Sequence, residues 1–311
     1  MAKAFDTPLV LSGPLRSPRQ MLADQTYDGH ESLHDDAMAQ DLGFKAAPIE
    51  GPTHFSQFVP LLHRLWGDAW FETGCLSAHF RNMVVEGEDV RAFVEPGAPD
   101  AKVIRIGADK AGGQEVLRGT ASVGREAGTS ELERRLAALR PAETLVILEH
   151  LSVGQRGPAA EAVRMDMDQR MGDLYPFSLA DKLKVITETT PWYSGPSPWG
   201  GAVIPLEMVS VLAQYTSHQA GMRGKGPAIG LFADLEIRML KGPLLVGRDY
   251  LIEREIVALS ESRRTESYWV KSRIMEPASR EVLAEMLLNH AVLKDSYAAY
   301  EDEYTRLRAA G

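Results

Sequence analysis

The sequence predicts an α+β protein made of two successive units, each an antiparallel sheet wrapped around one helix. Its 311 residues leave room for about two domains of ordinary size. The order of predicted elements repeats after about 150 residues, as in an internal duplication. In each unit a helix pattern precedes several apolar runs that turn residues separate, which is an α+β order. With 44% hydrophobic and 25% charged residues, the chain has enough apolar material for a core without disulfides or structural metals.

The first unit begins with two predicted helices. Residues 34–42 form a short helix that Gly43 caps, and residues 52–66 form a longer helix that Gly67 ends, with Pro60 as a kink inside it. One apolar stripe marks this longer helix: Phe55, Phe58, Val59, Leu62 and Trp66. Strands are expected at residues 75–85, 89–94, 102–108 and 114–123.

The second unit repeats this order, with a helix at residues 202–219. Strands are expected at residues 229–240, 249–259, 265–274 and 282–292, followed by a helix at 295–308. Gly51 and Gly201 open the two long helices, and Gly87 and Gly247 end comparable strands. A sheet around one helix, present twice, is the hot-dog arrangement, and two copies can protect their edge strands by pairing edge to edge.

A charged amphipathic helix at residues 131–139, ended by Pro141, connects the units. The expected organisation is therefore a domain at 1–127, a connector at 128–145 and a domain at 146–311.

Charge and cysteine content exclude several classes of protein. The net charge of −9, with no long basic cluster, argues against nucleic-acid binding. The single cysteine, Cys75, excludes a disulfide framework and suits a reducing compartment, and its apolar neighbours favour a buried side chain over a nucleophile. Neither a signal peptide nor a membrane span is recognisable, so a cytoplasmic location is expected.

Residues 28–51 read DGHESLHDDAMAQDLGFKAAPIEG. This segment resembles the signature of MaoC-like (R)-specific enoyl-CoA hydratases, which are hot-dog proteins. The resemblance covers most of residues 15–124, including the run Phe80-Arg81 to Gly87-Glu88-Asp89, and returns more weakly from about 180 to 293. The chain departs from the signature in two ways. Asp28 and His34 are separated by five residues instead of four, and Glu50 stands where the family has a histidine before the helix glycine.

The resemblance implies that an aspartate and a histidine activate one water, which adds across the C2=C3 bond of an enoyl thioester. His34 would be the general base or acid, with Asp28 or Glu31 as its partner. The backbone N–H of Gly51, at the start of the helix, would stabilise the enolate oxygen.

Other polar and aromatic residues are candidates for substrate contacts. The first unit offers His30, Glu50, Thr53 and His54, and the second offers Trp192, Tyr193 and Trp199, which either wall the substrate cavity or pack within their loop. The second unit has no histidine in the place of the catalytic loop, so it is interpreted as a copy that has lost the catalytic pair. The spacing of His30, His34, His54 and Glu50 supports no metal site. Five remaining histidines are expected to be structural: His63, His79, His150, His218 and His290.

The predicted function is that of a lyase, a hydratase or dehydratase acting on an acyl thioester that is linked to CoA. It would need no cofactor, and its partner would be this small molecule, with a homodimer compatible with the sequence. Two alternatives stay open. One is another reaction in the same cavity, such as thioester hydrolysis with Glu50 or a different elimination. The other is a ligand-binding hot-dog protein without catalysis. The two classes differ in whether His34 faces an apolar pocket beside Gly51 or faces solvent.

Overall fold

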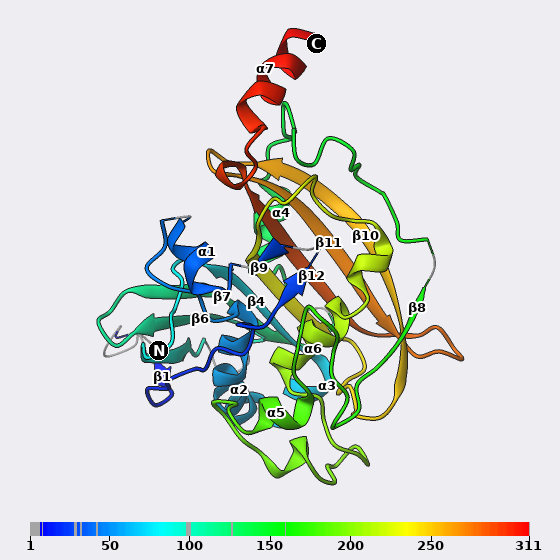
Figure 1. The fold of residues 1–311 in the computed structure, drawn as a ribbon. Helices are drawn as coiled ribbons and strands as arrows, with labels where there is room; N and C mark the ends of the chain where they lie inside the picture. The colour runs from blue at the N-terminus through cyan, green and yellow to red at the C-terminus, as the bar shows by residue number, and fades with distance from the viewer. Residues whose placement is uncertain are drawn as a thin grey trace.

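The computed structural model describes residues 7, 9–27, 30–31, 33–41, 43–97, 101–125, 127–158 and 160–310. Ten strands form one continuous antiparallel sheet that curves through the molecule (Figure 1). In spatial order they are β1 (Leu11–Ser12), β5 (Val90–Glu95), β6 (Val103–Lys110), β7 (Glu115–Val123), β4 (Gly74–Phe80), β9 (Gly230–Met239), β12 (Val282–Leu293), β11 (Thr265–Met275), β10 (Asp249–Glu261) and β8 (Glu161–Arg164). A separate short hairpin pairs β2 (Thr26–Tyr27) with β3 (His30–Glu31).

The sheet consists of two halves joined edge to edge, as the sequence predicts. Strands β4 and β9 pair antiparallel, from Cys75 opposite Arg238 to His79 opposite Asp234. Outward from this seam the strand order of the first half, residues 1–127, mirrors that of the second half, residues 146–311. Because each seam strand pairs with the other half, neither leaves an open edge at the centre of the molecule.

The long helix predicted for the first half is divided in two. A 3-10 helix, η1 (Gly51–Phe58), continues into α2 (Val59–Trp66). Pro60 explains the division, because it has no N–H to donate to Ser56 and its ring crowds that carbonyl in an α-helix. The carbonyl of Ser56 instead accepts from Val59, one residue earlier.

The helix of the second half, α6 (Leu206–Gln214), is shorter than predicted and begins after Pro205. The residue before a proline is driven to an extended conformation, and Ile204 donates its N–H to Leu244 at 2.9 Å. Ile49 makes the same bond to Val84 at 2.7 Å in the first half. The equivalent of Gly51 is therefore Leu206, two residues after Ile204, and the predicted match of Gly51 with Gly201 is wrong.

Most of the remaining helices are short, and the exception is α7 (Tyr300–Ala310), with 11 residues. The short ones are α1 (Asp36–Asp41), α3 (Ala69–Thr73), α4 (Glu131–Ala137), α5 (Leu179–Leu183), η2 (Pro191–Tyr193), η3 (Ser217–Ala220) and η4 (Lys294–Ser296). The first predicted strand also ends early, at Phe80, because the N–H groups of both Arg81 and Asn82 point to the Val116 carbonyl and break the ladder.

Helices η1 and α6 contact each other on the inner face of the sheet, where both halves share one apolar core. This core includes Phe55, Phe58, Leu62, Leu76, Met208, Leu212, Leu235 and Ile237. The connector helix α4 covers the outer face instead, with Leu132 packed between Trp269 and Leu287. A capping box of Ser130 and Glu133 starts this helix.

Candidate active site

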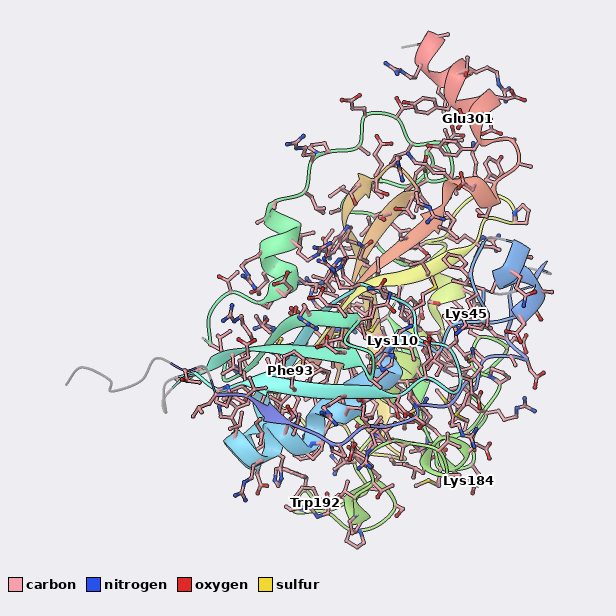
Figure 2. The ribbon with its side chains drawn as sticks, turned by 90° about the vertical axis from the view of Figure 1, so that its left-hand side faces the viewer. Lys45, Phe93, Lys110, Lys184, Trp192 and Glu301 are labelled. Atoms are coloured by element: carbon pink, nitrogen blue, oxygen red, sulfur yellow. The ribbon has the colours of Figure 1, made fainter. Side chains whose placement is uncertain are left out.

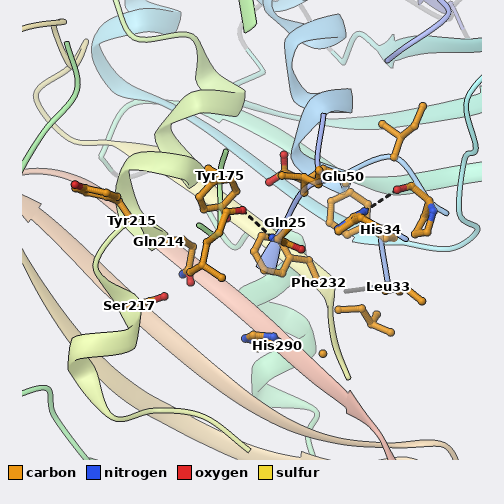
Figure 3. A pocket seen from close by; sticks show the side chains of 18 of the residues that line it. Gln25, Leu33, His34, Glu50, Tyr175, Gln214, Tyr215, Ser217, Phe232 and His290 are labelled. Carbon is orange, nitrogen blue, oxygen red and sulfur yellow. Dashed lines mark hydrogen bonds between the residues drawn. The ribbon is translucent and has the colours of Figure 1, made fainter. Parts of the chain in front are cut away.

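A cavity of about 690 Å³ lies between the two halves, beside the start of η1 (Figure 3). The first half contributes His34, Glu50, Gly51, His54 and the segment 80–84. The second half contributes residues 171–175, 214–219, 230–232, Tyr268 and His290. The side chain of Gln25 donates to the Leu174 carbonyl at 2.8 Å and ties the two walls together. This volume is typical of a small-molecule site.

His34 lines this cavity just before α1. Its Nδ1 lies 2.7 Å from the Pro48 carbonyl oxygen. A carbonyl can only accept, so Nδ1 carries the hydrogen and, in the neutral ring, Nε2 keeps its lone pair. Burial lowers the pKa of His34, against a smaller opposing effect of the bond to Pro48. The ring is therefore held as a neutral base in the tautomer that leaves Nε2 able to accept a proton.

Glu50 lines the same cavity and is only 8% exposed. Its Oε1 has no hydrogen-bond partner in the part of the chain that the structure describes. Burial raises the pKa of Glu50 to about 7, with nearby Lys182 lowering it and Glu207 raising it. At neutral pH this carboxyl group can therefore both donate and accept a proton.

Gly51 lines the same cavity as these two side chains and presents only its backbone to it. As the first residue of η1, its N–H belongs to the helix turn that has no intrahelical acceptor. A Cβ at this position would lie 2.8 Å from the ring of Phe80, so only glycine fits without displacing that ring. In the second half Leu206 occupies the equivalent position, and the same approach to the backbone is closed there.

A buried charged cluster lies behind Glu50. The Nζ of Lys182, on α5 of the second half, donates to Thr53 Oγ1 at 3.1 Å and lies 3.6 Å from Glu207 Oε2. Lys182 and Glu207 are 2% and 1% exposed. Burial, then Lys182, lowers the pKa of the cavity-lining His54 to about 4. Thr53 thus bonds to the second half and is not among the residues that line the cavity.

Sequence reasoning missed Lys182 and Glu207, although both interrupt apolar helical runs, LADKL and LEMVSVLAQ. A charged side chain in such a run signals a buried partner.

Of the two alternatives for the tryptophans of the second half, the structure supports packing, because neither Trp192 nor Trp199 is among the residues that line the cavity. Trp192 and Trp199 pack edge to face at 5.5 Å, and each contacts Phe71 of α3, at 5.5 and 5.3 Å. Tyr193 is buried in the same region but is absent from the residues that line the cavity. The positions of Trp192, Trp199 and Tyr193 are explained by the aromatic surface that they bury against the helices of the first half. Trp192 lies at the end of the molecule opposite Glu301 of α7 (Figure 2).

The proposed partners of His34 stay predictions. Asp28 lies outside the described residues. His30 and Glu31 form β3, but their side chains are outside what the structure describes.

Two histidines predicted to be structural, His218 and His290, line the cavity. A third, His79, donates through Nδ1 to Asp234 at 2.7 Å on the seam between the halves.

Other features predicted from composition can be located. Cys75 is buried, and burial raises the pKa of its thiol. Within the described ranges, no three His, Cys, Asp or Glu side chains gather as metal ligands would. In the same ranges, no helix has the length and apolar character that a membrane crossing requires.

Solved structures share this fold. A protein from Chloroflexus aurantiacus J-10-fl, described as a MaoC domain protein dehydratase, superimposes with a TM-score of 0.56 at 12% identity, covering 93% of this chain and 95% of that one. A conserved hypothetical protein from Mycobacterium tuberculosis, described as having a double hot-dog fold, superimposes with a TM-score of 0.53 at 11% identity, covering 93% of this chain and 97% of that one. No family model matches the sequence, and no curated protein matches it either. The shared architecture extends over nearly the whole chain, so this protein has the double hot-dog fold seen in a MaoC domain dehydratase.

Proposed function

We propose that this protein is a hydratase or dehydratase that adds water to, or removes it from, the C2=C3 bond of an acyl thioester. One observation carries the proposal: a neutral histidine, His34, and a carboxyl group of pKa about 7, Glu50, line one cavity beside the N-terminus of η1 at Gly51. When burial shifts the pKa values of two titratable groups in opposite directions, one group can act as a base and the other as an acid at the same pH.

In the hydration direction, His34 Nε2 takes a proton from water while the water oxygen bonds to C3. The π electrons move toward the thioester carbonyl, whose oxygen gains negative charge. The N–H of Gly51 donates to that oxygen, and the positive end of the helix dipole assists it. Protonated Glu50 then gives its proton to C2, which completes the addition. Dehydration uses the same groups in reverse, and proton exchange with solvent returns His34 and Glu50 to their starting states.

The test compares the wild type with His34→Ala by following the loss of enoyl absorbance of crotonyl-CoA and longer 2-enoyl-CoAs. Removal of a general base costs about 10²- to 10⁴-fold in rate, so we expect a fall of at least about 100-fold in kcat. His63→Gln is the matched control, since His63 is half-exposed on α2 and does not line the cavity. Absence of turnover by the wild type at every chain length would refute the proposal.

Thioester hydrolysis is a second candidate because of one observation, the unpartnered Oε1 of Glu50 beside the helix N-terminus. An ionised Glu50 could deprotonate a water that attacks the thioester carbonyl. The same assay distinguishes the reactions, because hydrolysis releases a free CoA thiol that a thiol reagent detects, whereas hydration releases none.

A further inference from the structure

We propose that the second half supplies a polar subsite in this cavity, formed by Gln214 and His290, which recognises a neutral hydroxyl or carbonyl group on the acyl chain. The inference rests on the proposed function for the reacting end of the substrate and names the kind of chain that it takes. Both residues line the cavity whose other wall holds His34 and Glu50 (Figure 3).

Two neighbours fix the ring of His290. Tyr268 lies directly opposite it in the β11–β12 register, with the phenol oxygen 2.6 Å from Nδ1 and the rings stacked at 4.8 Å. Phe232 of β9 packs edge to face at 5.8 Å. Because the orientation of the ring is set before any ligand binds, a hydrogen bond from this ring to a ligand costs little conformational entropy.

The absence of a side chain at Gly230 leaves room for the ring of His290 at the cavity wall. A Cβ on Gly230 would lie 2.4 Å from His290 Nε2. The imidazole therefore packs directly against this glycine, in the space that any side chain would need, and both Gly230 and His290 line the cavity. Burial lowers the pKa of His290 to about 4, and the ring is therefore neutral at physiological pH.

Gln214 brings the second polar group. It is the last residue of α6, it is 8% exposed, and its amide makes no hydrogen bond to any residue in the described part of the chain. A buried amide almost always has a partner. Because this amide lines the cavity, its partner is whatever occupies the cavity.

The pairing determines the chemistry of the ligand. A plain alkyl chain against this wall would displace water from the Gln214 amide and from His290 Nε2 without replacing its hydrogen bonds. A hydroxyl or carbonyl oxygen restores those bonds, and sites built for such a group discriminate strongly against the analogue that lacks it. Neither Gln214 nor His290 carries a charge, so the recognised group is neutral.

The test measures the dissociation constant of octanoyl-CoA and of hydroxyoctanoyl-CoAs, with the hydroxyl at C4 to C8, by titration calorimetry. These saturated esters cannot be hydrated, so binding is measured apart from turnover. For one hydroxyl position we expect wild-type binding at least about tenfold tighter than that of the plain chain. Gln214→Met and His290→Phe should each reduce this preference to below about threefold while leaving the affinity for plain octanoyl-CoA unchanged or higher. Gln114→Met, at an exposed turn, is the matched control.

Each other outcome counts against the subsite. Equal or tighter binding of the plain chain at every position, or a preference that survives both variants, would overturn it. Failure of every ester to bind would also overturn it, since no acyl chain would then reach this wall. The proposed function is tested separately. A hydroxyl preference without turnover of enoyl-CoAs would refute the hydratase function and support the subsite. Turnover without the preference would support the hydratase function and refute the subsite.

Discussion

Burial acts on His34 and Glu50 in opposite directions. It lowers the pKa of the imidazole and raises that of the carboxyl group, because in each case a low-dielectric surrounding disfavours the charged form. The result is a neutral base and a carboxyl group that is about half protonated in one cavity at neutral pH, although in water both groups would carry charge just below pH 6. The fold therefore creates the acid–base pair from two ordinary side chains.

A pH profile tests the role of Glu50. If protonated Glu50 delivers the proton in hydration, kcat/KM should fall as pH rises through about 7, where this group loses its proton. The acidic limb of the kcat/KM profile should lie at a pH below the usual pKa range of histidine, because the pKa of His34 is lowered. Glu50→Gln should remove the limb near pH 7 and lower kcat by about 100-fold. An unchanged alkaline limb in Glu50→Gln would assign that limb to another group.

The sequence predicted part of this site and missed another part, for a physical reason. Gly51, Glu50, His34 and His54 lie close together in the chain, and all of them line the cavity. The second half contributes Gln214, His290 and Lys182 from its strands and helices. The spacing of residues in the sequence gives no information about contacts between the two halves. The sequence therefore identified the wall made by the first half and not the wall opposite it.

At the scale of elements, α5 crosses to the other half and inserts Lys182 behind η1. This cation stabilises the ionised forms of Glu50 and Glu207, so its position adjusts the proton affinity of a residue more than one hundred positions away in the chain. A short helix of the second half thereby contributes to the electrostatic surroundings of Glu50 in the first half.

Lys182→Met tests this arrangement. Without the cation, the pKa of Glu50 should rise, and the alkaline limb of the kcat/KM profile should move to higher pH. Lys184→Met is the control on the same segment, because Lys184 is 72% exposed and pairs with Asp181. A profile that is the same in both variants would show that Lys182 only supports packing.

Strands were predicted more accurately than helices. The eight long strands fall within a few residues of the predicted ranges, except for the early end of β4, because apolar runs bounded by turn residues mark them directly. Two helix errors lie at Pro60 and Pro205, where helical periodicity continues through the sequence, and two more are the early end of α6 at Gln214 and the late start of α7 at Tyr300. A missing N–H and the restriction on the preceding residue override periodicity at the two prolines.

At the scale of the molecule, one buried carboxylate joins both halves and the connector. Asp234 of β9 is fully buried and accepts from His79 of β4 at 2.7 Å and from Asn289 of β12 at 2.6 Å. Arg135 of α4 forms an ion pair with it at 2.7 Å. Three polar groups from three parts of the fold therefore depend on a single side chain.

Asp234→Ala should lower the free energy of unfolding by about 3 kcal/mol, because it leaves buried donors without an acceptor. Since the sheet and the core are continuous across the seam, calorimetry should show one transition in both wild type and variant. Asp249→Ala is the control: this exposed residue pairs with Arg164 at the surface, and its loss should change stability by less than about 0.5 kcal/mol. Two separate transitions would show that the halves unfold independently.

The contrast between Gly51 and Leu206 has a consequence for how such a protein can change over time. In an assembly of two identical subunits, every substitution is inherited by both copies at once, so a residue needed in one copy is frozen in the other. Fusion of the two copies into a single chain removes that constraint. One helix start here has a glycine and the other a leucine, and a single chain allows the two copies to differ in this way.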